Sequence, residues 1–421
     1  MSHPAQKKTT ADNIMRAADM ALAMVAETII FLFTPFIFLY AFWVTRRPEK
    51  QAKTTIVVGL TEIANNIATT ADAFRQAGHE VITVARDNVL YADNYYDVVL
   101  PKSYVCLCVS KALTFMRLVN RADRFIYFWH ISYLPFGIDY LLLRLLGKAA
   151  LIQHCGDDVR YRPLQYHIDH HLQGHSMWGE ADIASPFAFF RALWAQRLPE
   201  ILGIPMMTVR DQATFQSQPA YHFIVPQKAL IDGPRAPSKV PVIIHAPSDK
   251  RVKRTDIVLE AIELLKAESA NFEFELIYEK PNHYVLERLQ QADIVVDQPG
   301  GWIGRFAMEA MAYSCVVVGG NRADYYGFAM KSPVLQFETN AETLAQTLRE
   351  LLSDHARLEK EMTAAYRFWH SYYSYDAYVR YIEDIFNGTA APSLQPVANI
   401  KSLLMQHARP YQRWAIKLLV W

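Results

Sequence analysis

Short apolar runs alternate with amphipathic stretches along most of the chain, and this alternation limits the fold more than any other feature. The runs at 55–59, 81–84 and 125–129 are rich in β-branched and aromatic residues, which is typical of strands, and the short run at 149–152 is wholly apolar. The stretches between them carry apolar residues at helical spacing. Strands that alternate with helices form parallel sheets covered by helices. The sequence therefore predicts an α/β fold.

A proline-rich segment interrupts the alternation once, and the pattern then begins again. Residues 232–241 read DGPRAPSKVP, a composition typical of a linker between domains. A second series of strands and helices starts with the predicted strand 241–245, which indicates two Rossmann-like domains. The predicted boundaries are an N-terminal tail and anchor at 1–52, a first domain at 53–235, a second domain at 236–386 and an amphipathic tail at 387–421.

An apolar stretch near the N-terminus predicts a membrane helix. Residues 21–44 read ALAMVAETIIFLFTPFIFLYAFWV, with Glu27 as the only charge. At about 1.5 Å per residue, a helix of this length crosses roughly 30 Å of hydrocarbon. Arg46 and Arg47 follow, and the positive-inside rule places that flank in the cytoplasm. Pro35 and Glu27 also permit a re-entrant or interfacial helix pair, and a buried helix of a soluble core is the other alternative.

The charge and cysteine content exclude several classes of protein. The chain has 43 Lys+Arg against 42 Asp+Glu, so its net charge gives no reason to expect a nucleic acid as partner. Four cysteines without a CxxC pair fit neither a zinc ribbon nor a disulfide framework, which favours a reducing compartment. Cys106 and Cys108 alternate along a predicted strand, where we expect buried structural thiols.

Cations follow the first predicted strand of the second domain. The segment from 245 to 256 reads HAPSDKRVKRTD and leads into a helix. Ser248 and the helix N-terminus offer hydrogen-bond donors, while Lys250 and Lys253 supply positive charge, a combination suited to a diphosphate. The alternative is a solvated basic turn.

A glycine-rich loop and a carboxylate-bearing helix follow a later strand of the same domain. Asp297 and Gln298 end the strand, and Gly304 and Arg305 open the helix that carries Glu309 one turn in. Glycines let backbone amides approach a phosphate, and a carboxylate set back from the helix start can accept hydrogen bonds from ribose hydroxyls. An ordinary exposed helix residue is the alternative for Glu309.

These two segments resemble the C-terminal domain of retaining, family-4-type glycosyltransferases with the GT-B fold. The resemblance implies that Lys250 and Lys253 contact the donor diphosphate. The family's E-x7-E segment corresponds to GWIG at 301–304 and EAMA at 309–312, so Glu309 resembles the ribose-binding glutamate. Gly301 occupies the place of the first glutamate, for which Asp297 or Gln298 are the candidate substitutes.

Polar residues also follow two strands of the first domain. His130 resembles the family's histidine near the transferred sugar. The run HCGDDVR at 154–160 is similar to a segment of some cell-surface polysaccharide glycosyltransferases.

The resemblance implies roles for further residues of this domain. Asp157 or Asp158 would orient the acceptor hydroxyl, while His154 and Arg160 would bind acceptor or phosphate. Arg160 can instead pair with either aspartate inside the loop. Gly59 stands where the family has a glycine-rich loop.

Together these features predict a membrane-anchored glycosyltransferase of a bacterial inner membrane with cytoplasmic catalytic domains. It would move a sugar from a nucleotide-sugar to a lipid-linked or polysaccharide acceptor, with retention and without metal or other cofactor. A catalytically silent GT-B module that binds nucleotide-sugar or glycan is the alternative, and a nucleotide-sugar epimerase is a third. The histidines around His167 match no zinc pattern. The basic, aromatic tail from Ile400 either lies on a membrane or packs back on the first domain.

Overall fold

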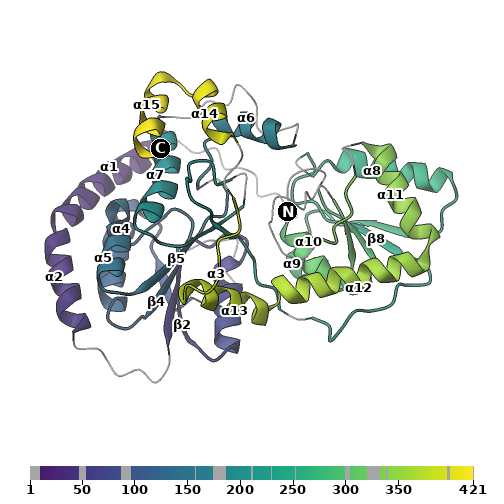
Figure 1. Ribbon diagram of the computed structural model, residues 1–421, viewed down its shortest axis with the longest axis horizontal. Helices are drawn as coiled ribbons and strands as arrows, with labels where there is room; N and C mark the ends of the chain where they lie inside the picture. The colour runs from purple at the N-terminus through teal and green to yellow at the C-terminus, as the bar shows by residue number, and fades with distance from the viewer. Residues whose placement is uncertain are drawn as a thin grey trace. The chain divides into compact units, whose positions relative to one another are not determined.

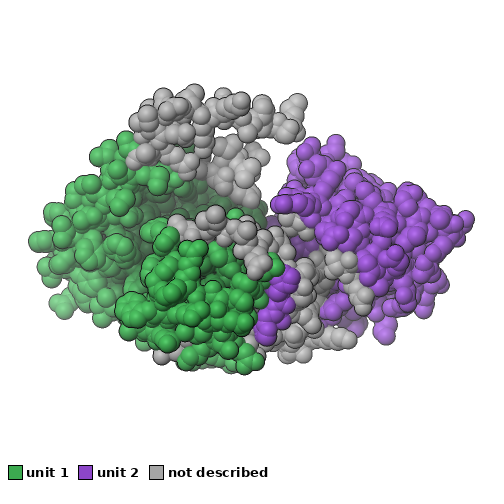
Figure 2. Space-filling model, turned by 90° about the horizontal axis from the view of Figure 1, so that it is seen from above, with its two compact units in different colours: residues 1–167, 180–223, 381–421 green, residues 168–179, 224–380 purple. Residues whose placement is uncertain are grey.

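The computed structural model describes twelve stretches of the chain, and all structural statements concern these residues. They are 10–46, 54–86, 96–156, 158–173, 186–209, 212–228, 230–251, 253–298, 304–319, 332–337, 340–395 and 399–420. The chain divides into two compact units, coloured separately in Figure 2. Unit 1 comprises Met1–His167, Glu180–Phe223 and Tyr381–Trp421, and unit 2 comprises Ile168–Gly179 and Ile224–Arg380.

Unit 1 is built on a parallel seven-stranded sheet in the order β3-β2-β1-β4-β5-β6-β7. Its central strands are buried because both faces are covered, which explains their continuous apolar runs. Four of the five strands predicted in this region are present. The strands are β1 (Thr55–Leu60), β2 (Glu80–Arg86), β3 (Val98–Leu100), β4 (Arg124–Phe128), β5 (Ala149–Gln153), β6 (Met206–Thr208) and β7 (Tyr221–His222).

Helices connect these strands and cover the sheet. The short helix η2 (Pro135–Gly137) follows β4 and leads directly into the next helix along the chain. The others are α3 (Asn66–Gln76), α4 (Tyr104–Leu118), α5 (Ile138–Leu145), α7 (Pro186–Ile201), α14 (Ile400–His407) and α15 (Pro410–Leu419). Helix α6 (Arg162–Gln173) runs across the division between the units. Cys106 and Cys108 lie in α4, so the predicted strand is wrong. The two thiols do not share a face, because Cys106 is exposed while Cys108 is buried and donates to Glu27.

The predicted membrane segment forms two helices, α1 (Thr10–Leu32) and α2 (Thr34–Thr45), and α1 packs along α4 (Figure 1). Asp19 of α1 fixes this contact, since its carboxylate accepts from the Tyr104 amide at 2.7 Å and from the Ser103 hydroxyl at 2.8 Å. No single described helix is long and apolar enough to cross a membrane. The helices Ala18–Leu32 and Thr34–Thr45 are bent by 55° relative to each other, and only the two together have the length and apolar composition that a crossing requires. Pro35 stands in the first turn of α2, where its missing amide costs nothing.

The C-terminal tail packs back on unit 1, which is one of its two predicted placements. Ala415 and Ile416 of α15 are buried, and the Leu419 carbonyl accepts a hydrogen bond from Arg197 Nε at 2.6 Å. Trp414 and Leu418 remain exposed on the opposite face of the same helix.

Unit 2 contains a smaller parallel sheet in the order β11-β10-β8-β9. The strand predicted at 241–245 is present as β8, and the predicted helix after the cations, the later strand and the helix with Glu309 are present as α8, β10 and α10. The elements are β8 (Val242–His245), α8 (Thr255–Ala267), β9 (Glu273–Leu276), α9 (Asn282–Leu289), β10 (Ile294–Val296), α10 (Arg305–Ala312), β11 (Val316–Val318), α11 (Ala341–Ser353) and α12 (His355–Tyr372). Helix α13 (Tyr375–Phe386) runs across the division between the units.

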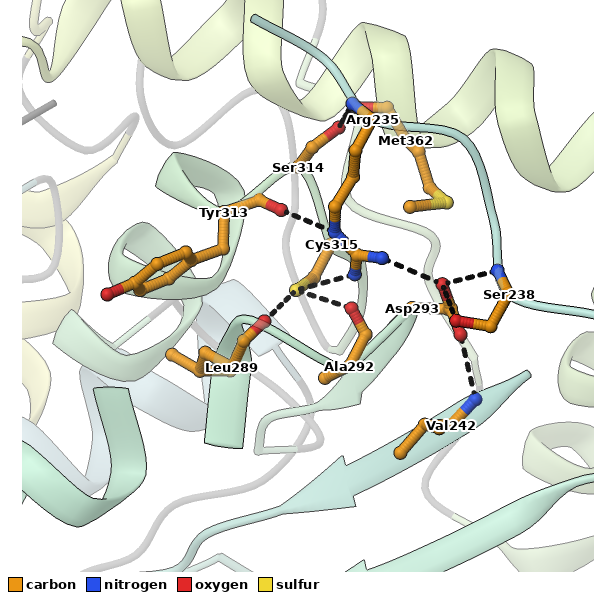
Figure 3. Close-up of polar contacts among 10 residues, drawn as sticks. All are labelled: Arg235, Ser238, Val242, Leu289, Ala292, Asp293, Tyr313, Ser314, Cys315 and Met362. Carbon is orange, nitrogen blue, oxygen red and sulfur yellow. Dashed lines mark hydrogen bonds and ion pairs between the residues drawn. The ribbon is translucent and has the colours of Figure 1, made fainter. Parts of the chain in front are cut away.

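The segment predicted as a linker is fastened to unit 2 by the buried carboxylate of Asp293 (Figure 3). Arg235 Nη1 lies 3.1 Å from Asp293 Oδ1, and the Ser238 amide donates to the same oxygen at 3.0 Å. The Val242 amide at the start of β8 donates to Asp293 Oδ2 at 2.9 Å. The proline content correctly predicted an irregular segment. The buried Asp293 carboxylate needs hydrogen-bond donors, and because Arg235 and Ser238 supply them, this segment is held against unit 2.

Candidate functional site

Three residues predicted for donor binding meet at the carboxyl end of the unit 2 sheet. Lys253 precedes α8, Asp297 follows β10, and Gly304 is the N-cap of α10. Lys253 Nζ lies 2.7 Å from Asp297 Oδ1, and the Gly304 amide donates to Asp297 Oδ2 at 2.8 Å. Asp297 therefore places a negative charge at the start of α10, where the helix dipole stabilises anions.

The ion pair lies close against Gly304. A Cβ there would stand 3.1 Å from Lys253 Nζ and 3.3 Å from Asp297 Oδ2, which is tighter than ordinary contact. The Asp297 side chain is almost fully buried and that of Lys253 is mostly buried. A ligand phosphate that reaches Lys253 would thus meet a cation that the fold already orients.

Glu309 lies one turn further along α10 and is buried, so the alternative of an exposed helix residue is wrong. Arg305 Nε donates to Glu309 Oε1 at 2.9 Å, and Asn282 Nδ2 of α9 lies 3.4 Å from both carboxylate oxygens. Sequence reasoning missed Asn282, because nothing in the local pattern links α9 to α10. The carboxylate keeps acceptor capacity for further donors, since each of its oxygens has more than one lone pair.

The remaining predicted donor residues lie around this cluster. Ser248 and Lys250 are exposed after β8, and Lys250 Nζ stands 4.1 Å from the centre of the Tyr278 ring. Gln298 is half-buried directly after Asp297. Residues 299–303, and with them Gly301, lie outside the described residues.

His245 at the end of β8 has a structural role. Its Nδ1 lies 2.8 Å from the Val296 carbonyl and its Nε2 lies 3.0 Å from Thr255 Oγ1, so the ring joins β8, β10 and α8. Burial lowers the pKa of His245, which keeps the ring neutral at pH 7.

In unit 1 a buried histidine–aspartate pair follows β5. His154 Nδ1 lies 2.9 Å from Asp158 Oδ2, and the Gly156 amide donates to Asp158 Oδ1 at 2.8 Å. Burial works to raise the pKa of Asp158, but the hydrogen bond from His154, together with the Gly156 amide, holds this pKa below its usual value. An ionised Asp158 fixes the proton of His154 on Nδ1 and leaves Nε2 as an acceptor.

His130 follows the neighbouring strand β4 and lines the same cavity as His154. This cavity has a volume of about 650 Å³ and also reaches Lys111 of α4 and Arg191 of α7. Burial lowers the pKa of His130 to about 4, so this ring is neutral at pH 7. Sequence reasoning missed Lys111 and Arg191, which lie in the middle of helices far from any strand end.

The other predicted residues of unit 1 have different surroundings. Gly59 lies inside β1, so the predicted glycine-rich loop at this position is wrong. A Cβ on Gly59 would overlap the Val84 carbonyl oxygen, and close packing against β2 accounts for the glycine. Arg160 is buried beside Gly156, whose ideal Cβ position is 2.9 Å from an Arg160 guanidinium nitrogen. Asp157 lies outside the described residues.

Among the described residues, no group of three histidine, cysteine or carboxylate side chains is arranged to hold a metal ion. His167, the first residue of the histidine-rich run, lies in α6 and stacks on the ring of His407, with 3.6 Å between ring centres.

Comparison with known proteins gives evidence of fold and not of family. No protein-family model matches the chain, and a search of curated proteins found no match. Among solved structures, HepE from Anabaena in complex with UDP and glucose matches with a TM-score of 0.53 and 8% identity, over 80% of this chain and 100% of HepE. Sucrose-phosphate synthase from Thermosynechococcus elongatus matches with a TM-score of 0.52 and 9% identity, over 80% of this chain and 99% of the synthase.

These likenesses settle the architecture. The chain has the fold of GT-B glycosyltransferases. The predicted mixed α/β architecture with parallel sheets is thereby confirmed. At these identities the comparison carries the fold alone, and the family-4 retaining type stays a prediction.

Proposed function

We propose that this protein is a glycosyltransferase that transfers a sugar from a nucleotide-sugar to a lipid-linked or polysaccharide acceptor. The observation that carries the proposal is the cluster of Lys253, Asp297 and Gly304 at the carboxyl ends of β8 and β10, with Glu309 one turn along α10. Ligands of open α/β sheets bind at this edge. The fold shared with HepE, which was solved with UDP and glucose, supports a nucleotide-sugar as the donor.

The donor side would act through charge and hydrogen bonding. Lys253 and the amides at the start of α10 would stabilise the diphosphate as it leaves. Glu309, held by Arg305 and Asn282, would accept hydrogen bonds from the ribose hydroxyls. These groups require no metal, and we propose that the nucleotide-sugar is the only co-substrate.

On the acceptor side, His154 is our candidate for the general base. Its Nε2 would take the proton of an acceptor hydroxyl while Asp158 stabilises the imidazolium that forms. The hydroxyl oxygen would bond to the anomeric carbon, and the bond from that carbon to the diphosphate would break, with its electron pair moving to the leaving oxygen. His130, neutral beside it, would contact the transferred sugar.

The configuration at the anomeric carbon of the product distinguishes two mechanisms. The family resemblance implies retention, whereas a base in the position of His154 favours direct displacement with inversion. Proton NMR of the product, recorded before the anomers equilibrate, distinguishes them. An α-linked product from an α-linked donor would remove His154 as the base of a direct displacement.

We also propose that the protein acts at the cytoplasmic face of a bacterial inner membrane. Exposed apolar side chains on α1 and α2, among them Phe33, Phe36, Leu39 and Trp43, support a lipid contact. We expect the protein to float with anionic liposomes in a density gradient. Recovery of the whole chain in the lipid-free fraction would contradict this proposal.

Calorimetric titration of nucleoside diphosphates, with and without EDTA, tests the donor site. We expect saturable binding that EDTA leaves unchanged. Lys253→Met should weaken it about tenfold or more, because a charge-assisted hydrogen bond to phosphate is lost. Lys266→Ala is the matched control, since its side chain is exposed and pairs only at the surface with Glu263. Equal affinity of Lys253→Met and the parent protein would place the nucleotide elsewhere.

A catalytically silent module is the second candidate, and one contact favours it. Asp297 already neutralises Lys253, and Gly301 stands where the family has a glutamate. This candidate predicts nucleotide binding without hydrolysis or transfer. Hydrolysis of a nucleotide-sugar by the purified protein, abolished in Lys253→Met, would exclude it.

A further inference from the structure

The cavity of unit 1 differs in character from one end to the other. Its inner end is polar and is formed by His130, Ser132 and His154 after β4 and β5, with Lys111 and Arg191 from two helices. Its remaining wall is apolar and comes from η2, α5 and α7. That wall includes Leu134, Phe136, Tyr140, Phe187, Phe190 and Trp194. A site of this kind suits a ligand with an anionic end and an apolar body.

The apolar wall is exposed to an extent that is unusual for side chains of this size. Phe187 is 77% exposed, Phe190 42% and Trp194 41%, and their spacing places all three on one face of α7. Phe136 of η2 is exposed beside them and meets the ring of Phe31 in α1 edge to face, with 5.7 Å between ring centres. The wall therefore continues into the apolar surface of α1. Exposed apolar patches of this kind mark sites that a ligand or membrane covers.

The polar end holds two cations, Lys111 and Arg191, and two nitrogens that lack partners among the described residues. Lys111 is buried, with its Nζ donating to the Ser132 carbonyl at 3.0 Å, and Arg191 lies near it in the lining. Glu27 is the only carboxylate among the described residues that line the cavity. His154 Nε2 and His130 Nδ1 are buried and find no hydrogen-bond partner among the residues that the structure describes. A buried polar atom without a partner is costly, so a ligand that bonds to these nitrogens is stabilised.

We propose that this cavity binds a lipid-linked phosphate, with the phosphate against Lys111 and Arg191 and the first part of the lipid chain against the apolar face of α7. The inference rests on the proposed function and narrows its acceptor to lipid-linked phosphates. Where the lipid-linked phosphate carries a sugar, a hydroxyl of that sugar would be the group that gives its proton to the free nitrogen of His154.

The size of the cavity agrees with such an occupant. A volume of about 650 Å³ lies within the range of about 300 to 1,000 Å³ found for pockets that hold small ligands. A long lipid chain exceeds it, and the remainder of the chain would follow Phe187 and Phe136 toward α1. A soluble glycan would leave this aromatic wall exposed to water, and for that reason we favour the lipid.

Photolabelling of the full-length protein in a phosphate-free detergent tests the proposal. The probe is farnesyl phosphate with a photoactivatable group on its chain, and mass spectrometry locates the labelled peptides. We expect the label on α7 and η2. Unlabelled farnesyl phosphate should compete about tenfold more strongly than farnesol, because only the phosphate uses Lys111 and Arg191. Inorganic phosphate alone should not compete.

Two variants and a matched control sharpen the result. Ala195→Trp fills the cavity and should reduce labelling of α7 at least about fivefold, as should Trp194→Ala, which removes part of its wall. Trp414→Ala removes a tryptophan that is 67% exposed on α15 outside the cavity, and it should label like the parent protein. Circular dichroism of each variant verifies its fold.

The outcomes separate this inference from the proposed function. Equal competition by farnesol, or equal labelling of α2 and α7, would overturn the lipid-phosphate site. If nucleoside diphosphates still bind in the same preparation, the proposed function survives that result. Specific labelling of α7 in a protein that binds no nucleotide would support the cavity site and remove the donor assignment.

Discussion

In each unit an aspartate side chain accepts a hydrogen bond from the first residue of the first strand, and the two units differ in the surroundings of that aspartate. In unit 1, Asp123 precedes β4 and its carboxylate accepts from the Thr55 amide at the start of β1, at 2.9 Å. In unit 2, Asp293 precedes β10 and accepts from the Val242 amide at the start of β8, also at 2.9 Å. The backbone amides of both aspartates return a hydrogen bond to the same strands.

The difference lies in burial and in the number of donors. Asp123 is exposed, whereas Asp293 is fully buried and also holds Arg235 and Ser238. One position of the fold thus serves as a surface cap in unit 1 and as the anchor of the incoming chain in unit 2. Equivalent topology does not imply equivalent energetics.

The carboxyl ends of the two sheets differ more strongly. After β4 and β5, unit 1 presents His130 and His154 to a cavity with an aromatic wall. After β8 and β10, unit 2 presents the ion pair of Lys253 and Asp297 beside a helix N-terminus. The first arrangement suits an amphiphilic ligand and the second suits a diphosphate. Two similar frameworks are therefore specialised by the few residues that follow their strands.

The largest difference in stability between the two units should appear when Asp293 and Asp123 are each replaced by alanine. Asp293→Ala leaves the Arg235 guanidinium and three further donors without their acceptor, and we expect a loss of about 3 kcal/mol of unfolding free energy in unit 2. Asp123→Ala removes one acceptor at the surface and should cost unit 1 below about 1 kcal/mol. Hydrogen exchange resolved by peptide measures each unit separately.

Arg349→Ala is a useful control for this comparison. It breaks an exposed ion pair with Glu268 in unit 2 and should change exchange there very little. Comparable losses in Asp293→Ala and Asp123→Ala would show that burial does not separate the two positions.

The sequence was sufficient to predict the framework and most of the donor cluster. Buried parallel strands are continuous apolar runs, so β1, β4, β8 and β10 are visible without a structure. Polar residues that follow such strands gather at one edge, which is why Lys253 and Asp297 could be grouped in advance.

The cavity could not be predicted in the same way. Lys111 and Arg191 lie in the middle of α4 and α7, and only tertiary packing brings them to the ends of β4 and β5. Cys106 and Cys108 illustrate the other limit. Their spacing of two suits one face of a strand, and only the Ser103 cap and the contact with α1 show that they belong to a helix.

Unit 1 should also differ from unit 2 in how its stability responds to pH, because of Asp139 in α5. Its buried carboxyl accepts from the Tyr127 hydroxyl and the Tyr133 amide, both at 2.9 Å, and burial raises its pKa to about 6. The native state then holds a proton that the unfolded chain releases above about pH 4. This contribution to stability is complete below pH 4 and is lost as the pH rises through 6, and it amounts to about 3 kcal/mol at about 1.4 kcal/mol per pKa unit.

Denaturant unfolding of Asp139→Asn and the parent protein between pH 4 and 7 checks this prediction. The difference between their unfolding free energies should change by about 3 kcal/mol across that range, with the parent losing stability relative to the variant. His130 and His222, whose pKa values burial lowers to about 4, act in the opposite direction but are common to both proteins and cancel. A constant difference would mean that Asp139 is ionised throughout.

The smallest effect separates two roles for Gly59, packing within β1 and contact with an acceptor phosphate. Gly59→Ala makes a methyl group overlap the Val84 carbonyl oxygen, so β1 and β2 must move apart, and we expect a loss of about 2 kcal/mol of unfolding free energy. Gly233→Ala in the segment before β8 meets nothing within 4 Å and should be nearly neutral. Thermal unfolding and acceptor binding are measured together. Lower stability with unchanged acceptor affinity would show that Gly59 is a packing residue. Weaker acceptor binding at unchanged stability would instead place Gly59 in the acceptor site, because β1 would then have room for the methyl group and its loss of binding would need another cause.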